Sequence, residues 1–226
     1  MKFTLYTADC VGSLPNSIYP HKCVITDENS MKAAVAFDHV AAEYTNNHRS
    51  NTDFLSSDNI PMDCDNDHSD DANDWVTPLE VAMAFPGVEF VVVYSRSNMK
   101  PKNGKSLRPR FHVYFPIPLI TDAAAYTAIK KRIAAEFSYF DKNALDSARL
   151  LFGVPNPQVE IYNGDMSIVD FLDNEDFEQW DNDSASVPEG SRNSTMSHYA
   201  GCIIKRLGNT DEAYRRCIFQ PAGSEL

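Results

Sequence analysis

The chain has 226 residues, of which 43% are hydrophobic and 11% aromatic, so it can bury a core and does not belong to the disordered class. Its formal net charge of −12 argues against a generally basic nucleic-acid-binding protein. No run of about 18 apolar residues is present, and the opening residues MKFTLYTADCVGS lack the long apolar core of a signal peptide. We therefore predict a soluble cytoplasmic protein without membrane contact.

The first third of the chain is expected to contain a strand with turns, a helix and a second strand. We predict the strand with turns over residues 1–30 and the second strand over residues 59–65. A helix is predicted over residues 31–45, because apolar residues recur there at intervals of three and four. These residues are Ala34, Phe37, Ala41 and Tyr44.

Two further helices have recognisable beginnings. Thr77, Pro78 and Glu80 provide an N-cap, a proline in the first turn and a capping box. This helix is predicted to end near Phe85. The residues Thr-Asp at 121–122 begin the next helix. Its predicted core face carries Tyr126, Ile129, Ile133 and Phe137, and its predicted outer face carries Lys130, Lys131 and Arg132.

Three apolar runs between and after these helices are interpreted as strands. VEFVVVY, which begins at Val88, is a continuous apolar run typical of a buried strand. RFHVYFPI and QVEIYNG alternate apolar and polar residues. A short helical segment is predicted over residues 144–152.

The interleaved strands and helices predict an α+β fold with a mixed or antiparallel sheet and packed helices. We place this domain at residues 1–172. Residues 173–189 are strongly acidic and are interpreted as a linker. Residues 190–226 are interpreted as a small helical appendage, in which Gly208 ends the first helix.

The stretch MDCDNDHSDD begins a cluster of six acidic residues between Asp63 and Asp74. Side chains two residues apart on a strand share a face. Asp63 and Asp65 are therefore expected to point together, while Met62 and Cys64 point to the core. Two carboxylates on one rigid face suit Mg²⁺ or Mn²⁺.

Two other interpretations of this cluster are open. Its odd-numbered spacing partly matches a calcium-binding EF-hand loop, but His68 stands where that loop needs glycine. The acids after Asp65 are alternatively a solvated surface loop. They are Asp67, Asp70, Asp71 and Asp74.

Polar side chains also recur at intervals of two on the two later strands. His112 shares its predicted face with Arg110 and Tyr114. Glu160 shares its predicted face with Tyr162. Together with the two aspartates, these strands offer three carboxylates, an imidazole and an arginine, a set that suits nucleotidyl transfer with two metal ions. Taken alone, His112 is also compatible with an ordinary buried histidine.

A basic run lies directly before the His112 strand. Residues 96–110, RSNMKPKNGKSLRPR, contain six basic residues and no acidic one, so they can hold a triphosphate in spite of the negative net charge. A solvated loop is the alternative. His48 and Arg49, in the polar loop before the acidic strand, are either surface residues or contacts to a template or nucleotide.

The order of these motifs resembles that of the archaeo-eukaryotic primase superfamily, and more closely the primase-polymerase modules of phages, prophages and plasmids. IPMDCDND corresponds to the first motif, RPRFHVYFP to the second and QVEIYNG to the third. The resemblance covers roughly residues 35–170 and implies a sheet like that of an RNA-recognition motif. The stretch VPEGSRNSTMSHYAGCIIKRLGNTDEAY resembles the opening of the small helical domain that often follows such modules.

Carried over by position, the resemblance implies that Asp63, Asp65 and Glu160 are catalytic ligands of two Mg²⁺ or Mn²⁺ ions. Asp146 is a rival for the third position. His112 is implied to act in catalysis by contacting the phosphates of the incoming nucleotide. The implied nucleotide-binding residues beside it are Arg110, Lys105, Arg96 and Arg149.

The implied function is template-directed nucleotidyl transfer by a DNA primase-polymerase of a mobile element in the host cytoplasm. Single-stranded DNA, ribo- or deoxynucleoside triphosphates and a replicative helicase from another domain or chain are the implied partners. A rolling-circle replication nuclease is an alternative, but that class needs a His-x-His pair, and here Tyr114 takes the place of the second histidine. A non-catalytic acidic protein that mimics nucleic acid agrees with the net charge but does not explain the basic run.

Overall fold

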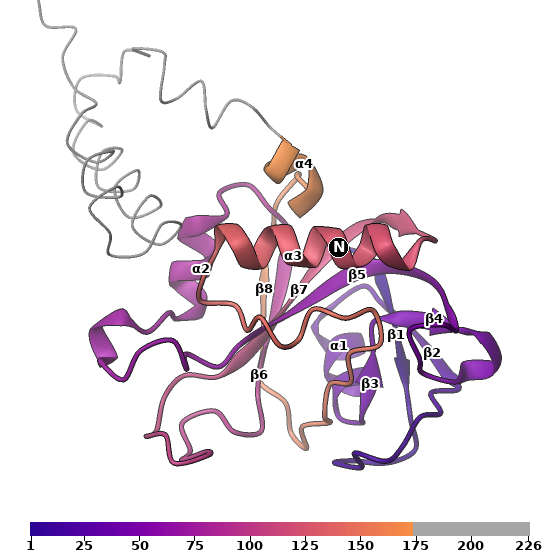
Figure 1. Cartoon of the computed structure of the whole chain (residues 1–226), viewed down its shortest axis with the longest axis horizontal. Helices are drawn as coiled ribbons and strands as arrows, with labels where there is room; N and C mark the ends of the chain where they lie inside the picture. Colours follow the sequence, from indigo (N-terminus) through magenta and orange to yellow (C-terminus); the bar gives the residue numbers. More distant parts are fainter. Residues whose placement is uncertain (174–226) are drawn as a thin grey trace, which may run out of the picture.

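The computed structural model describes residues 1–173, and a five-stranded sheet is its central feature (Figure 1). The strand order is β4-β5-β7-β6-β8, and all neighbouring strands are antiparallel. The strands are β4 (Ala42–Tyr44), β5 (Phe54–Cys64), β7 (Phe111–Ile120), β6 (Phe90–Tyr94) and β8 (Val159–Tyr162). The predicted helical appendage and nearly all of the predicted linker lie outside the described residues.

The N-terminal part of the chain forms a smaller sheet. β1 (Phe3–Thr7) pairs antiparallel with β2 (His21–Ile25) and with β3 (His39–Val40). Helix α1 (Glu28–Val35) connects β2 to β3. The sequence predicted one strand with turns over residues 1–30 and missed β2, of which four of the five residues are not buried, so it lacks the apolar signal of a core strand.

Three helices cover one face of the large sheet: α2 (Pro78–Ala84), α3 (Ala123–Glu136) and α4 (Ile168–Asp173). The side chains of Thr77 and Asp122 cap α2 and α3, as predicted. Two short 3-10 turns complete the described elements, η1 (Thr45–Asn47) and η2 (Ala72–Asp74).

Both faces of the large sheet are buried along most of its length. On the helix-covered face, Met62, Val92 and Val113 belong to the main core. On the opposite face, Val93 and Tyr114 pack in a second core with the N-terminal sheet and α1. The strand faces that the sequence predicted to be polar are therefore covered along most of their length.

The predicted helix over residues 31–45 ends early. α1 stops at Val35, and the chain then forms β3 and β4. The fully buried carboxylate of Asp38 accepts three backbone N–H hydrogen bonds of 2.7 Å from distant segments. These bonds hold the backbone after α1 against other parts of the chain, and Phe37, expected in the apolar stripe, is 43% exposed.

Two other predictions need correction. Residues 144–152 form turns and extended chain instead of a helix. Lys130, expected on the outer face of α3, is fully buried. It lies four residues after Tyr126 and three before Ile133, so it shares their core-facing side of the helix.

The fold class is α+β with antiparallel sheets, as predicted. The elements β5-α2-β6-β7-α3-β8 follow the β-α-β-β-α-β order of split β-α-β domains. The last strand, β8, pairs with β6, and β4 lies beside β5. In the part of the chain described by the structure, no helix is long and apolar enough to cross a membrane.

Candidate active site

A pocket of about 320 Å³ lies where β5 ends and β7 begins. Its lining contains three aspartates, one histidine and four basic side chains. They are Asp63, Asp65, Asp146, His112, Arg49, Arg96, Lys102 and Arg149. Asp63, Asp65 and His112, which the sequence assigned to one site, are thus brought together.

Asp63 is the most deeply placed acid of the pocket. It lies opposite His112 in the register of β5 and β7, and its Oδ1 is 3.3 Å from His112 Nε2. Its Oδ2 accepts a hydrogen bond of 2.5 Å from Arg149. Burial acts to raise the pKa of Asp63, but the charges of His112 and Arg149 outweigh it, so the pKa lies below its ordinary value. The carboxylate is therefore held ionised.

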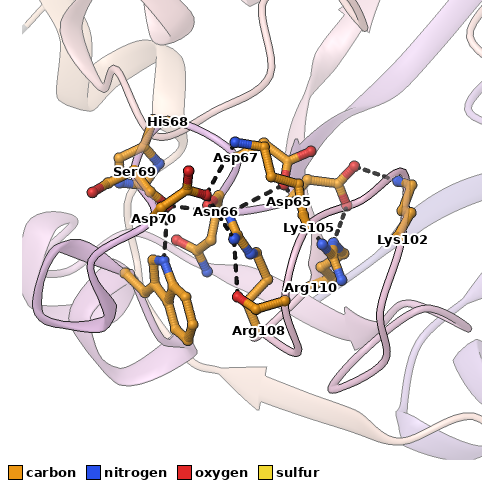
Figure 2. Close-up of polar contacts among 12 residues, drawn as sticks. Asp65, Asn66, Asp67, His68, Ser69, Asp70, Lys102, Lys105, Arg108 and Arg110 are labelled. Atoms are coloured by element: carbon orange, nitrogen blue, oxygen red, sulfur yellow. Dashed lines mark hydrogen bonds and ion pairs between the residues drawn. The ribbon is translucent and has the colours of Figure 1, made fainter.

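Asp65 follows the last residue of β5 and is more open than Asp63. Its Oδ2 lies 2.5 Å from Nζ of Lys102, and its Oδ1 lies 3.7 Å from Nε of Arg110. Both contacts are drawn in Figure 2. The side chain of Lys102 is 35% exposed, so this ion pair can open without unfolding its surroundings.

Asp146 supplies the third carboxylate of the pocket lining. Its Oδ1 accepts a hydrogen bond of 2.9 Å from the backbone N–H of Ala148. Its carbonyl oxygen lies 3.2 Å from Nζ of the buried Lys130. Of the two predicted rivals for the third acidic position, Asp146 is the one that lines the pocket.

Glu160 does not share the face of Asp63. Val159 lies opposite Val93, and Val93 lies opposite His112. Since neighbouring residues on a strand point to opposite faces, Glu160 points to the side covered by the helices. The register across two strand pairs, which the sequence does not show, therefore places Glu160 on the opposite face of the sheet from Asp63 and His112, although Glu160 shares its face with Tyr162 as predicted.

The carboxylate of Glu160 is already engaged by two phenols. Tyr94 and Tyr162 each donate a hydrogen bond of 2.7 Å to it. Burial together with the hydrogen bond to Glu160 raises the pKa of Tyr94 to about 12. Both phenols therefore remain neutral hydrogen-bond donors at physiological pH. Glu160 thus serves to connect Tyr94 and Tyr162 within the fold.

Some of the predicted basic contacts line the pocket. They are Arg49, Arg96 and Arg149. Arg49 donates a hydrogen bond of 2.9 Å from Nη1 to the carbonyl oxygen of Ala148. This bond ties the segment that carries Arg149 to the loop before β5.

The remaining predicted basic residues are not part of the pocket lining. Lys105 pairs with Asp70 at 3.0 Å, and His48 pairs with Asp53 at 2.7 Å. Arg110 is fully buried and donates from Nη1 to two backbone carbonyl oxygens of its own loop. The structure therefore does not bring Lys105, Arg110 or His48 into the pocket.

The crowded acids beyond the strand are balanced by the basic run, as Figure 2 shows. Arg108 is 1% exposed and lies 3.0 Å from Asp70 and 3.5 Å from Asp67. Arg110 Nη2 lies 3.6 Å from Asp67. Arg108 and Arg110 thus offset the charges of Asp67 and Asp70, two of the acids that the sequence alone attributed to a cation or to solvent.

The donor set fits a divalent cation shared with a nucleotide better than one held by protein alone. Within residues 1–173, no group of three or more His, Cys, Asp or Glu side chains is arranged to hold a metal ion. Mg²⁺ in nucleotide sites is bound by one or two carboxylates together with substrate phosphates and water. Asp63 and Asp65 line one pocket and meet this requirement.

One residue of the pocket lining and one buried lysine beside Asp146 escaped the sequence analysis. Lys102 belongs to the basic run but was not singled out from its neighbours, although it is the lysine that reaches Asp65. Lys130 was assigned to the outer face of α3. Its spacing from Tyr126 and Ile133 indicates the core-facing side of α3. The prediction placed Lys130 outside because a charged residue is usually exposed.

Comparison with known proteins gives little further information. No family model matches the chain, and no curated protein matches it. Among solved structures, the chain is similar to the cyanophage S-2L primase-polymerase (PrimPol) AEP domain, with 16% sequence identity and a TM-score of 0.39. The similarity covers 72% of this chain and 81% of that one.

Proposed function

We propose that the chain is a nucleotidyltransferase that extends a nucleic-acid strand on a single-stranded DNA template, as a primase-polymerase of a phage, prophage or plasmid does. One observation carries the proposal: acidic side chains, His112 and four basic side chains converge on one pocket. The order of the sequence motifs around Asp63 and His112 agrees with it.

The mixture of charges in the pocket suits a nucleoside triphosphate that carries a divalent cation. The carboxylates attract the cation, and the basic side chains attract the phosphates. A pocket of about 320 Å³ lies within the usual range for small ligands. A purely acidic or purely basic pocket would suit only one of the two partners.

Each side chain then has a definite part in binding. Asp63 and Asp65 would hold the cation, while His112 and Arg149 balance the buried charge of Asp63 and line the same pocket, where they would contact the phosphates. Lys102, which pairs with Asp65, would be free to contact a phosphate oxygen once Asp65 held the cation. A bound Mg²⁺ or Mn²⁺ supplies activation of the attacking hydroxyl group and stabilisation of the leaving pyrophosphate.

The proposed partners are a single-stranded DNA template, ribo- or deoxynucleoside triphosphates and a replicative helicase supplied by another domain or chain. Arg49 lines the pocket and is the stronger template or nucleotide contact of the His48–Arg49 pair. His48 is engaged with Asp53 on the neighbouring loop.

The test compares wild-type protein with Asp63→Asn and Asp65→Asn variants in template-directed synthesis. Each protein is incubated with single-stranded DNA, labelled nucleotides and Mg²⁺ or Mn²⁺, with and without a primer. The matched control is Asp70→Asn, which removes an acid of the same cluster outside the pocket lining. We expect metal-dependent products from wild type and control and none from the two pocket variants.

Other outcomes would identify a different class of protein. Cleavage of the template without synthesis would indicate a replication nuclease. Folded wild-type protein that neither synthesises, cleaves nor binds metal would support a non-catalytic acidic protein. Equal synthesis by wild type and Asp63→Asn would show that the pocket is not the active site.

A further inference from the structure

Arg96 lines the pocket as an exposed residue, and its guanidinium group lies against two segments that are distant in the sequence. Its guanidinium carbon lies 4.1 Å from the centre of the Phe152 ring, within the range of a cation–π contact. It also approaches Gly12 so closely that a Cβ atom there would lie 2.9 Å from its Nη1 atom. A φ of +75° at Gly12 independently favours glycine.

The carboxylate of Asp38 ties these two segments together. Its Oδ1 accepts hydrogen bonds from the backbone N–H groups of Gly12 and Gly153, and its Oδ2 accepts one from Ser13, each of 2.7 Å. Asp38 is fully buried. An ionised carboxylate is purely an acceptor, so a single side chain serves all three donors and fixes both segments.

The segment that carries Phe152 is also fixed by its backbone. His39 and Leu151 exchange two backbone hydrogen bonds of 2.9 and 3.0 Å. At Gly153, a Cβ atom would lie 2.6 Å from the backbone carbon of Phe37. The backbone that carries the Phe152 ring is therefore packed against residues 37–39 on both sides, so a shift of Phe152 would break these contacts.

We propose that Asp38 is a positioning residue, and that Arg96, placed between Gly12 and Phe152, is a pre-organised contact for the phosphates of a nucleoside triphosphate. A guanidinium group that is already fixed loses less conformational freedom on binding. This inference rests on the proposed function and deepens it. It also gives the N-terminal segment before residue 35, which lies outside the motif resemblance, a part in the site.

The test is a double-mutant cycle on nucleotide affinity in the full-length chain. The Kd of a nucleoside triphosphate is measured by calorimetry with Mg²⁺ for wild type, Phe152→Leu, Arg96→Ala and the double variant. We expect Phe152→Leu to weaken binding about fivefold, as for a partly exposed cation–π contact, and to raise KM with little change in kcat. In the Arg96→Ala background, Phe152→Leu should change the Kd by less than about twofold.

Conservative variants separate positioning from general stability. Phe152→Tyr keeps the ring and should retain wild-type affinity. Asp38→Asn should act in the same direction as Phe152→Leu and should likewise lose its effect when Arg96 is already alanine. If Asp38→Asn fails to fold, the cycle with Phe152 still tests the contact, and Gly12→Ala, which crowds Arg96 directly, tests the N-terminal side.

The possible failures are distinguishable. If wild type does not bind a nucleoside triphosphate, the proposed function is wrong and the inference with it. If wild type binds but the effects of Phe152→Leu and Arg96→Ala are independent and additive, the proposed function stands and the positioning of Arg96 is overturned. A loss of affinity in Phe152→Tyr equal to that in Phe152→Leu would also overturn it.

Discussion

The acidic cluster of residues 63–74 is divided between two regions with different surroundings. Asp63 and Asp65 line the pocket, and the side chain of Asp63 is only 8% exposed. Asp67 and Asp70 lie on a surface loop, where their side chains are 41% and 73% exposed. Within a few positions, one aspartate is a buried charge in the pocket lining, whereas the next ones are exposed partners of an arginine.

The basic partners explain the difference between the two regions. Arg149, which pairs with Asp63, is 35% exposed and lines the pocket, so a ligand can compete for it. Arg108, in the loop region, is 1% exposed, and its Nη1 also donates to the carbonyl oxygens of Asn66 and Ser69 at 2.8 and 3.0 Å. A ligand can compete for the cation of an ion pair when that cation is exposed. The ion pair is structural when its cation is buried and also donates hydrogen bonds to backbone carbonyl oxygens.

The largest expected effect lies beneath the pocket, at Lys130. Burial lowers the pKa of Lys130 to about 8, against the opposing charges of Asp63 and Asp146, from an ordinary value of 10.5. Between these two values the unfolded chain binds more protons than the folded chain, so stability rises with pH. We expect the free energy of unfolding of wild type relative to Lys130→Met to rise by roughly 3 kcal/mol from pH 8 to pH 10.5, as measured by urea unfolding.

The matched control for Lys130 is its neighbour Lys131, which is exposed on the same helix. Lys131→Met should give a difference from wild type that does not depend on pH over this range. A pH-independent difference for Lys130→Met as well would contradict the prediction, because it would mean that Lys130 carries the same charge in the folded and unfolded chain.

In the loop region, Arg108→Met is expected to lower the free energy of unfolding by about 2 kcal/mol, since it leaves the buried carbonyl oxygen of Asn66 without its side-chain donor. The carbonyl oxygen of Ser69 keeps the hydrogen bond from Trp75 Nε1, so the cost comes from Asn66 more than from Ser69 or the exposed aspartates. Urea unfolding at neutral pH measures it, and Lys105→Met, which removes a half-exposed partner of Asp70, is the control. Equal effects of the two substitutions would show that the buried arginine has no special structural part.

Four of the five strands of the large sheet and two of its covering helices were predictable because their signals are local. Caps at Thr77 and Asp122 placed the two helices, the apolar runs placed β6, β7 and β8, and β4 was missed because it lies inside the predicted helix over residues 31–45. The helix over residues 31–45 was overextended because an apolar period of three and four is also met by buried strand and turn residues. The helix ends before Asp38, whose buried carboxylate accepts hydrogen bonds from residues that lie 25 to 115 positions away in the sequence.

The site was predictable only within single strands. The alternation of side chains predicted which residues of one strand share a face, and Asp63 and His112 line the same pocket. Alternation alone could not place Glu160 relative to them, because the register between β6 and β8 depends on how the strands pair. Asp146 and Arg149 come from a segment of turns, for which no periodic pattern exists.

A smaller effect is expected at Lys102, where the two regions meet. Lys102→Met removes the cation that pairs with Asp65, so Mn²⁺ should bind the nucleotide-free protein a few-fold more tightly, as expected for the loss of a partly exposed charge. Nucleoside triphosphate affinity should fall, because the proposed contact between Lys102 and a phosphate is lost. Calorimetric titrations with Mn²⁺ and with the nucleotide measure the two changes separately.

Lys105→Met again serves as the control for Lys102, since Lys105 reaches Asp70 and not the pocket. It should leave the Mn²⁺ affinity unchanged. If both lysine variants tightened Mn²⁺ binding equally, the effect would be one of overall charge, and the specific competition at Asp65 would be excluded.

The smallest effect is expected for Asp70→Asn. Arg108 and Lys105 hold the pKa of Asp70 below its ordinary value, but the side chain is 73% exposed, and ion pairs in solvent contribute little to stability. Arg108 keeps its bonds to the backbone without it. We therefore expect no measurable change in melting temperature or in synthesis. A clear loss of stability would mean that the arginine depends on the acid, and the division of the cluster into a functional and a structural region would then have to be drawn at Asp70 instead of between Asp65 and Asp67.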